Sequence, residues 1–99
     1  MTITGKQVRA LRSMANSIKP SVTVGKAGVN ENVLAQASEA LEAHELIKVS
    51  VHCETGAQAA EFGSEIASAL SADVVQVIGK RIVLYRESSR DDIEKIELP

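Results

Sequence analysis

The sequence predicts an α/β two-layer sandwich with a four-stranded mixed sheet. Apolar residues recur at helical spacing in three segments and alternate with polar residues in four others, in the order α-β-α-β-α-β-β. Two successive β-α-β units need right-handed crossovers, which place both crossover helices on the same side of the sheet. The last two strands are joined by a tight hairpin, so the final strand is antiparallel and the sheet is mixed.

The composition is that of one small globular domain. Hydrophobic residues make up 44% of the 99 residues and aromatic residues only 2%, so Val, Ile, Leu and Ala must build the core. We expect a single domain over residues 1–99, with a core at about 4–86 and a charged tail at 87–99. The single cysteine, Cys53, excludes an internal disulfide and fits a reducing cytoplasm. No apolar leader region and no run of about 20 apolar residues is present, so we expect neither a signal peptide nor a membrane span.

The first predicted helix spans residues 4–18. One face carries an apolar stripe, made of Val8, Leu11, Ala15 and Ile18. Another face carries the three cations Lys6, Arg9 and Arg12 and no acid. Lys19-Pro20 ends the helix, because proline disfavours a helical conformation in the residue before it. A solvated face usually mixes both signs of charge, so this uniformly positive face favours a binding role.

A short strand, a glycine-bracketed loop and a second helix follow. Val22 and Val24 alternate with polar neighbours, and Asn30 is a suitable N-cap for a helix over about 31–44. The loop between them is Gly25-Lys26-Ala27-Gly28, a GxxG sequence whose glycines allow a tight turn and a close approach to the main chain. Lys26 and the following helix N-terminus would suit a phosphate. The loop is not a Walker A motif, and taken alone it favours a structural turn with a solvated lysine.

The second half of the chain supplies the remaining elements. Residues 46–52 read as a strand that turns Lys48, Ser50 and His52 to its open face. Thr55 and Gln58 have the spacing of a capping box, and the helix that they open runs to about residue 71.

The two final strands, 74–78 and 81–85, are joined by Gly79-Lys80, which matches a type II′ turn. The hairpin has one predicted face of Val75, Val77, Ile82 and Leu84, and another of Gln76, Ile78, Arg81, Val83 and Tyr85. The tail is expected to be an edge strand or a loose end, with Ile93, Ile96 and Leu98 as its candidate anchors.

The charges are segregated along the chain although the formal net charge is only −2. Residues 1–30 hold five Lys or Arg and no acid, and residues 74–86 hold three, Lys80, Arg81 and Arg86, again without an acid. The rest of the chain is acidic. This asymmetry favours one surface that faces a polyanion on an otherwise acidic body.

Catalysis and metal binding find little support in the sequence. His52 and Cys53 are adjacent on a strand, so their side chains diverge and cannot share a metal or form a catalytic pair. His44 reads as a packing or helix-end residue. We find no pairing of a nucleophile with a base at useful spacing. We therefore expect no enzyme activity, no catalytic residues, no metal and no cofactor.

Four stretches of the sequence resemble one known family. They are 19–29 (KPSVTVGKAGV), 40–49 (ALEAHELIKV), 76–80 (QVIGK) and 83–86 (VLYR). In this order they resemble the CRM domains, named for chloroplast RNA splicing and ribosome maturation, whose stand-alone bacterial form is the YhbY-type RNA-binding protein. The resemblance implies a fold like the C-terminal domain of translation initiation factor three and association with precursors of the large ribosomal subunit. It also implies that the GxxG loop contacts RNA. The sequence departs from the family pattern at Asn16, where His is frequent, and at Ser50, where a basic residue is common.

The resulting hypothesis is non-catalytic RNA binding, mainly through the RNA backbone and shape, with a strong dependence on salt. Main-chain amides of Gly25, Lys26, Ala27 and Gly28 and the Lys26 ammonium would hold phosphates. The expected extensions of this track are Lys6, Arg9, Arg12 and Lys19, with a second contribution from Lys80, Arg81 and Arg86. The expected partner is ribosomal RNA, with no DNA and no membrane. The alternative is a protein-interaction or assembly module that uses the acidic face.

Overall fold

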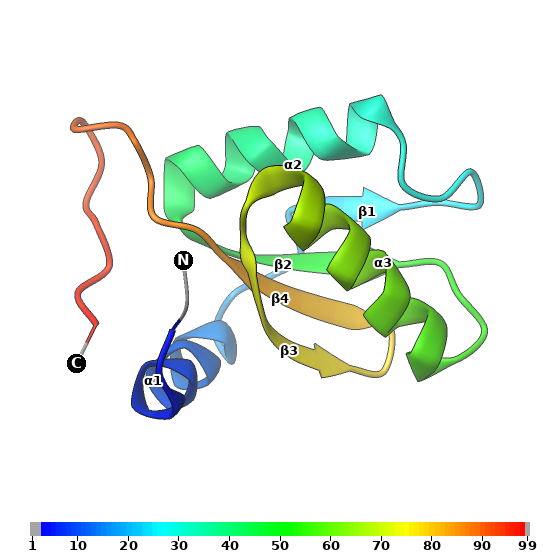
Figure 1. The fold of residues 1–99 in the computed structure, drawn as a ribbon, viewed down its shortest axis with the longest axis horizontal. Coiled ribbons are helices and arrows are strands. Elements are labelled where there is room, and N and C mark those ends of the chain that lie inside the picture. Colours follow the sequence, from blue (N-terminus) through cyan, green and yellow to red (C-terminus); the bar gives the residue numbers. More distant parts are fainter. Residues whose placement is uncertain (1–2, 99) are drawn as a thin grey trace.

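The computed structural model describes residues 3–98. These residues form three helices and four strands in the predicted order (Figure 1). The elements are α1 (Gly5–Ala15), β1 (Val22–Val24), α2 (Glu31–His44), β2 (Leu46–Val51), α3 (Gly56–Leu70), β3 (Asp73–Ile78) and β4 (Arg81–Tyr85).

The strands form one mixed sheet in the order β1-β2-β4-β3. β1 is parallel to β2, whereas β4 is antiparallel to both β2 and β3. The last strand is therefore inserted between the two strands that α3 connects. Gly79 has a φ of 55° and Lys80 keeps a negative φ, as a type II′ turn requires. The predicted α/β class and the mixed sheet are confirmed.

The main core lies between the sheet and the two crossover helices, which cover the same face (Figure 1). Its largest fully buried side chains are aliphatic: Leu41 from α2, Ile66 from α3, and Ile47, Ile82 and Leu84 from the sheet. Each such side chain contributes about 1.5–3 kcal/mol when it leaves water. This cluster explains how a chain with almost no aromatic residues builds a stable core.

A second apolar cluster lies on the opposite face of the sheet, where α1 packs. Leu11 and Ala15 of α1 are buried there against Val83 and Tyr85 of β4. A two-layer sandwich leaves this face open, and α1 instead covers part of it as a short third layer. The helix packs on β2, β3 and β4, and Thr23 of β1 stays exposed.

One predicted face assignment in the hairpin is wrong. The register between β3 and β4 shifts between Val74 and Gln76, so Val75 is an extra residue in β3. Such a bulge changes which side of the sheet a residue faces. Val75 therefore packs in the α1 cluster with Val83, and not with Val77 and Ile82 in the main core.

The helix ends follow capping rules, with two differences from the predictions. Asn30 Oδ1 accepts from the N–H of Val33, as predicted, and Thr55 Oγ1 accepts from the N–H of Gln58. The Gln58 side chain, however, accepts from the N–H of Glu54 and not from the N-cap residue. The complete capping box belongs to α1, where Thr4 and Gln7 bond reciprocally. α1 ends at Ala15, three residues before its predicted end.

The segment after β4 is neither an edge strand nor a loose end, because buried polar contacts hold it in place. Glu45, which is 1% exposed, accepts from the N–H groups of Ser88 (2.6 Å) and Ile96 (2.7 Å). Ser89 donates to the Glu42 carboxylate from both its hydroxyl and its N–H. These bonds are the main reason that the pKa of Glu42 lies below its usual range. Of the three predicted anchors, Ile96 packs on the α1 cluster together with Leu98, and Ile93 does not.

Candidate nucleic-acid interface

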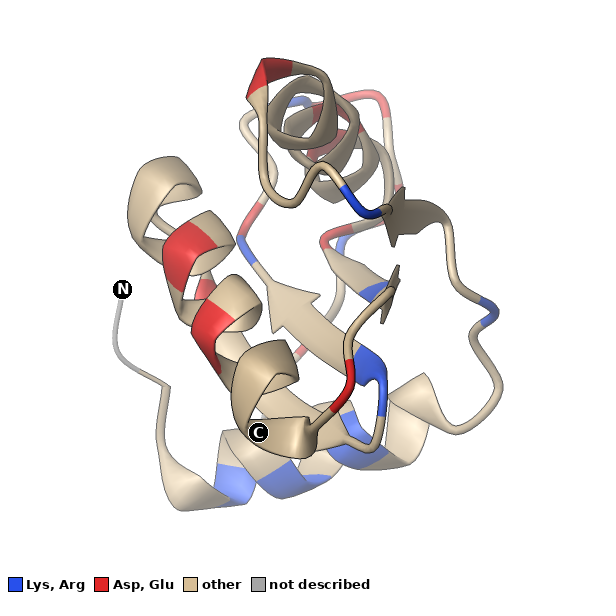
Figure 2. Ribbon diagram, turned by 90° about the vertical axis from the view of Figure 1, so that its right-hand side faces the viewer, with Lys and Arg blue, Asp and Glu red and all other residues tan. Residues whose placement is uncertain are grey.

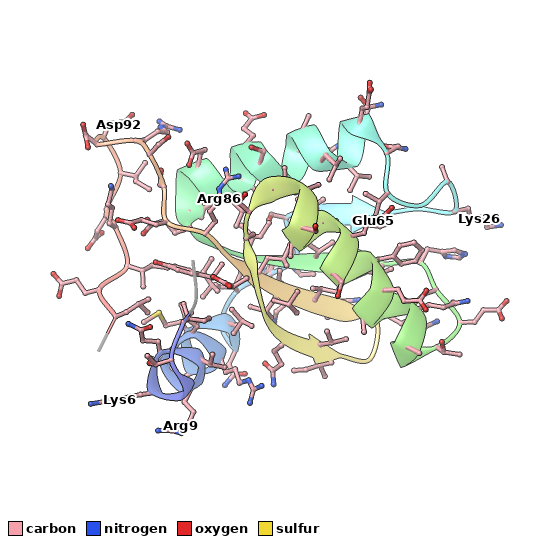
Figure 3. All side chains as sticks on the ribbon, in the orientation of Figure 1. Lys6, Arg9, Lys26, Glu65, Arg86 and Asp92 are labelled. Atoms are coloured by element: carbon pink, nitrogen blue, oxygen red, sulfur yellow. The ribbon has the colours of Figure 1, made fainter. Side chains whose placement is uncertain are left out.

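The GxxG loop is a tight turn that carries Lys26 at its tip. The N–H of Gly28 donates to the carbonyl of Gly25 over 3.0 Å, which closes the turn. Lys26 and Ala27 occupy its two central positions, and both are exposed. In Figure 3 the Lys26 side chain points outward from the far right end of the molecule. The loop therefore presents a full positive charge to solvent.

The loop has fewer main-chain donors for an anion than the sequence predicts. The N–H of Gly28 is already used inside the turn, and Asn30 caps the N–H of Val33. Glu31 also places an acidic side chain in the first turn of α2, which opposes an anion at that helix end. The attraction of this loop for a phosphate therefore rests chiefly on the Lys26 ammonium.

The two glycines of the loop are not equivalent. Gly28 has a φ of 77°, and a Cβ there would lie 3.7 Å from the Phe62 ring, whereas Gly25 has no positive φ and open space around it. We expect Gly28→Ala to destabilise the fold by about 1–2 kcal/mol, since a left-handed conformation costs an L-residue that much. Gly25→Ala should leave stability within about 0.5 kcal/mol. Urea unfolding of both variants checks this, and equal losses would contradict it.

Lys26 faces a second lysine across an open pocket at the end of the sheet. The pocket has a volume of about 650 Å³ and is lined by Lys26, His52, Cys53, Glu54, Gln58 and Lys80. Gln58 lies in the first turn of α3, and the other lining residues come from the three loops that follow β1, β2 and β3. Lys26 and Lys80 both point into solvent there, and Glu54 is the only acid in the lining. The pocket thus gathers positive charge that the sequence shows only as separate residues.

The positive surface continues from this pocket onto the α1 face of the sheet. Arg81 starts β4 directly after Lys80, and its guanidinium donates to Ser50 Oγ over 3.1 Å. Lys48 lines the same small groove as Arg81. Arg12 of α1 donates from Nε over 3.2 Å to the carbonyl of Val75, the residue before Gln76 of that groove. We call Lys26, Lys80, Arg81, Lys48 and Arg12 the basic strip.

The first helix and the GxxG loop are not direct neighbours. Lys6 and Arg9 project from the lower left of Figure 3, while Lys26 lies at the far right, along a molecule that is 35 Å long. The predicted extension of the track by Lys6 and Arg9 therefore does not adjoin the GxxG loop directly, and the role of these cations in RNA binding stays a prediction. Lys48 and Arg81 supply the connection between the first helix and the loop. Lys19 lies apart from the strip, beside an apolar pocket that includes Met14 and His44.

Arg86, one of the predicted RNA contacts, has a structural position. Its guanidinium donates to the carbonyls of Leu70 (3.0 Å) and Ser38 (3.2 Å) and lies 3.6 Å from the Glu42 carboxylate. It thus joins the C-terminal part of α2 to the end of α3, between which Figure 3 shows it. With its donors used in this way, Arg86 is not part of the candidate interface.

The sequence reasoning omitted two residues of this surface, Lys48 and His52. Both alternate with the buried residues of β2, so their outward direction was visible in the sequence. Lys48 is the one base in residues 31–73, which hold eight acids, so a count of charge along the chain does not group it with the basic segments. A count of charge along the chain therefore misses Lys48, which the pairing of β2 with β4 brings into the same groove as Arg81.

Basic and acidic residues occupy different layers of the molecule. In Figure 2 the blue bands of Lys and Arg run along α1 at the bottom, and the red bands of Asp and Glu lie mostly on the helices of the other layer. Glu61 and Glu65 are exposed on α3, and Glu31 and Glu39 on α2. The net charge of −2 therefore hides two surfaces of opposite sign.

Comparison with known proteins identifies the family. A model described as the CRS1 / YhbY (CRM) domain matches residues 3–86. The chain belongs to this family. Similar proteins to this CRM domain include the "Probable RNA-binding protein YqeI" of Bacillus subtilis, 48% identical over 98% of this chain and 99% of that protein. An "RNA-binding protein" of Haemophilus influenzae is 38% identical over 99% of this chain and 96% of that protein.

A solved structure also resembles this CRM domain. The solution structure of a Staphylococcus aureus protein described as "a putative RNA binding protein" matches with a TM-score of 0.86 and 44% identity, over 99% of this chain and 100% of that one. Within residues 3–98, no helix is long and apolar enough to cross a membrane. The same residues contain no cluster of three or more His, Cys, Asp or Glu side chains placed to hold a metal ion.

Proposed function

We propose that this CRM domain binds RNA without catalysing a reaction, and that its target is ribosomal RNA in precursors of the large ribosomal subunit. The observation that carries the proposal is the basic strip, which runs from the GxxG loop across the exposed end of the sheet to α1. Relatives across nearly the whole length of the chain are named RNA-binding proteins. The ribosomal target is what the family resemblance implies, and the lone buried Cys53 suits a reducing cytoplasm.

The strip favours recognition of the phosphate backbone over base stacking. Its members are all Lys or Arg, and the chain has only one tyrosine, Tyr85, which is 3% exposed and packed under α1. Phe62 is partly buried on the main core. Without an exposed aromatic platform, electrostatic attraction must supply most of the affinity.

Salt dependence tests this mechanism directly. If about four phosphates are neutralised, the logarithm of the association constant should fall with the logarithm of the salt concentration at a slope of roughly −3, using the coefficient for single strands. Between 50 and 200 mM salt this slope corresponds to a loss of about 50-fold in affinity. Fluorescence anisotropy with a labelled RNA measures it, and a slope near zero would refute backbone binding.

The identity of the RNA needs an experiment in cells. Ultraviolet crosslinking followed by sequencing of the attached RNA should enrich ribosomal RNA of immature large subunits over messenger and transfer RNA. Enrichment of another RNA class would keep the binding mechanism and overturn the proposed target. Recovery of proteins without RNA would instead support the assembly module that uses the acidic face.

A further inference from the structure

Beside the basic strip, the α1 face of the sheet carries a small groove of mixed chemistry. Two rows of side chains cross the strands here, because the registers align Lys48 with Val83 and Gln76, and Ser50 with Arg81 and Ile78. The C-terminal end of α1 closes one side with Ala15 and Asn16. The groove has a volume of about 120 Å³, which is too small for a typical drug-sized ligand.

The groove has an apolar floor and one exposed apolar wall. Val83 at the bottom is 2% exposed, whereas Ile78 at the rim is 54% exposed and is the most exposed large hydrophobic residue in residues 3–98. Ile78, on the edge strand β3, lies beside Arg81 of β4. It offers a flat apolar surface to a planar group.

Two amide side chains in the groove indicate a ligand that also has a polar edge. Asn16 and Gln76 line the groove, and within residues 3–98 neither side chain is hydrogen-bonded to another part of the chain. Each amide offers both a donor and an acceptor, which is the pairing that the edge of a nucleobase requires. Lys48 and Arg81 flank them, where the phosphates on either side of such a base would lie.

We propose that this groove receives one unpaired nucleobase of the bound RNA. The base would lie against Ile78, its edge would face Asn16 and Gln76, and its phosphates would meet Lys48 and Arg81. This inference rests on the proposed RNA binding and adds to it a preference for RNA with a bulged or looped-out nucleotide. Paired bases cannot enter, because their edges are already occupied and their faces stacked.

The test compares two labelled RNA hairpins with the same stem, one fully paired and one with a single bulged nucleotide. We expect the protein to bind the bulged hairpin about tenfold more tightly at equal salt, which corresponds to about 1.4 kcal/mol. Ile78→Ser and Gln76→Ala should abolish this preference and leave affinity for the paired hairpin unchanged. An abasic residue at the bulge should do the same for the unchanged protein.

Val74→Ser is the matched control. Like Ile78, Val74 is an exposed aliphatic residue of β3, with 36% of its surface exposed. Unlike Ile78, it pairs with Leu84, which belongs to the main core on the other face of the sheet. The Val74→Ser variant should keep the tenfold preference. Equal affinity of the unchanged protein for both hairpins would refute the proposal that the groove receives a base, and would leave the proposed RNA binding intact. Equal losses on both hairpins in Ile78→Ser would also overturn it, because the residue would then serve general docking. Failure to bind either hairpin would refute the proposed function itself.

Discussion

Replacing Lys26 and Lys80 together with glutamine is expected to weaken RNA binding about 25-fold at 0.1 M salt. Each phosphate contact to a single strand contributes about 0.7 to the salt slope, so the loss of two contacts lowers the affinity by that factor at this concentration. The slope itself should fall from roughly −3 to about −1.5. Both lysines are exposed and line one pocket, so the substitution should not disturb the fold. Anisotropy titrations at several salt concentrations measure both quantities.

A matched pair of substitutions separates local contacts from overall charge. Arg90→Gln with Lys95→Gln removes the same two positive charges from the tail, where both residues are exposed and Arg90 pairs with Asp92. This variant should keep the slope near −3. Equal weakening by both pairs would show that net charge, and not the basic strip, governs binding.

A third pair asks how far the interface extends along α1. Lys6 and Arg9 lie toward the end of the molecule remote from Lys26. Substituting both with glutamine should spare binding of a short RNA that spans only the strip, and should weaken binding of a longer one that reaches α1. The comparison therefore decides whether the predicted cations of the first helix belong to the same binding surface.

The sequence predicted the fold well because its periodicities are strong and its turns are short. The bounds of α2 and β4 agree with the prediction, since Asn30, Gly79 and the alternation in 81–85 are local signals. The bulge at Val75 could not be predicted, because a run of apolar residues reads the same with or without an extra residue. The tail was also ambiguous, since its order depends on Glu45, a residue 43 positions before Ser88.

The candidate site was predicted only in part, for a related reason. Charge along the chain identified Lys26, Lys80 and Arg81, which lie in turns or at a strand end. The same charge pattern grouped Arg86 with them, because Arg86 is close to Lys80 and Arg81 in sequence. The Arg86 guanidinium, however, donates hydrogen bonds to carbonyls of α2 and α3. Conversely, Lys48 joins the strip only through the pairing of β2 with β4. Which cations share a surface is decided by strand register, and register is a long-range property of the sheet.

Glu45→Ala is expected to destabilise the protein by about 2–4 kcal/mol. The Glu45 carboxylate is buried and accepts from the N–H groups of Ser88 and Ile96, and each buried donor left without an acceptor costs about 1–3 kcal/mol. Glu42→Ala serves as the control, because that carboxylate is 26% exposed and water can replace it; its loss should cost at most about 1 kcal/mol. Urea unfolding gives both values, and amide hydrogen exchange at Ser88 and Ile96 should accelerate in Glu45→Ala.

Glu45→Gly distinguishes the contribution of the Glu45 carboxylate to stability from the contribution of the backbone conformation at the same position. Glu45 has a φ of 64° and a ψ of −37°, and a positive φ suits glycine better than alanine because glycine has no Cβ. Glu45→Gly should therefore be more stable than Glu45→Ala by about 1 kcal/mol, while both lose the tail contacts. If the two variants were equally unstable, backbone strain would play no part here. If both variants retained full stability, the carboxylate would not hold the tail in place.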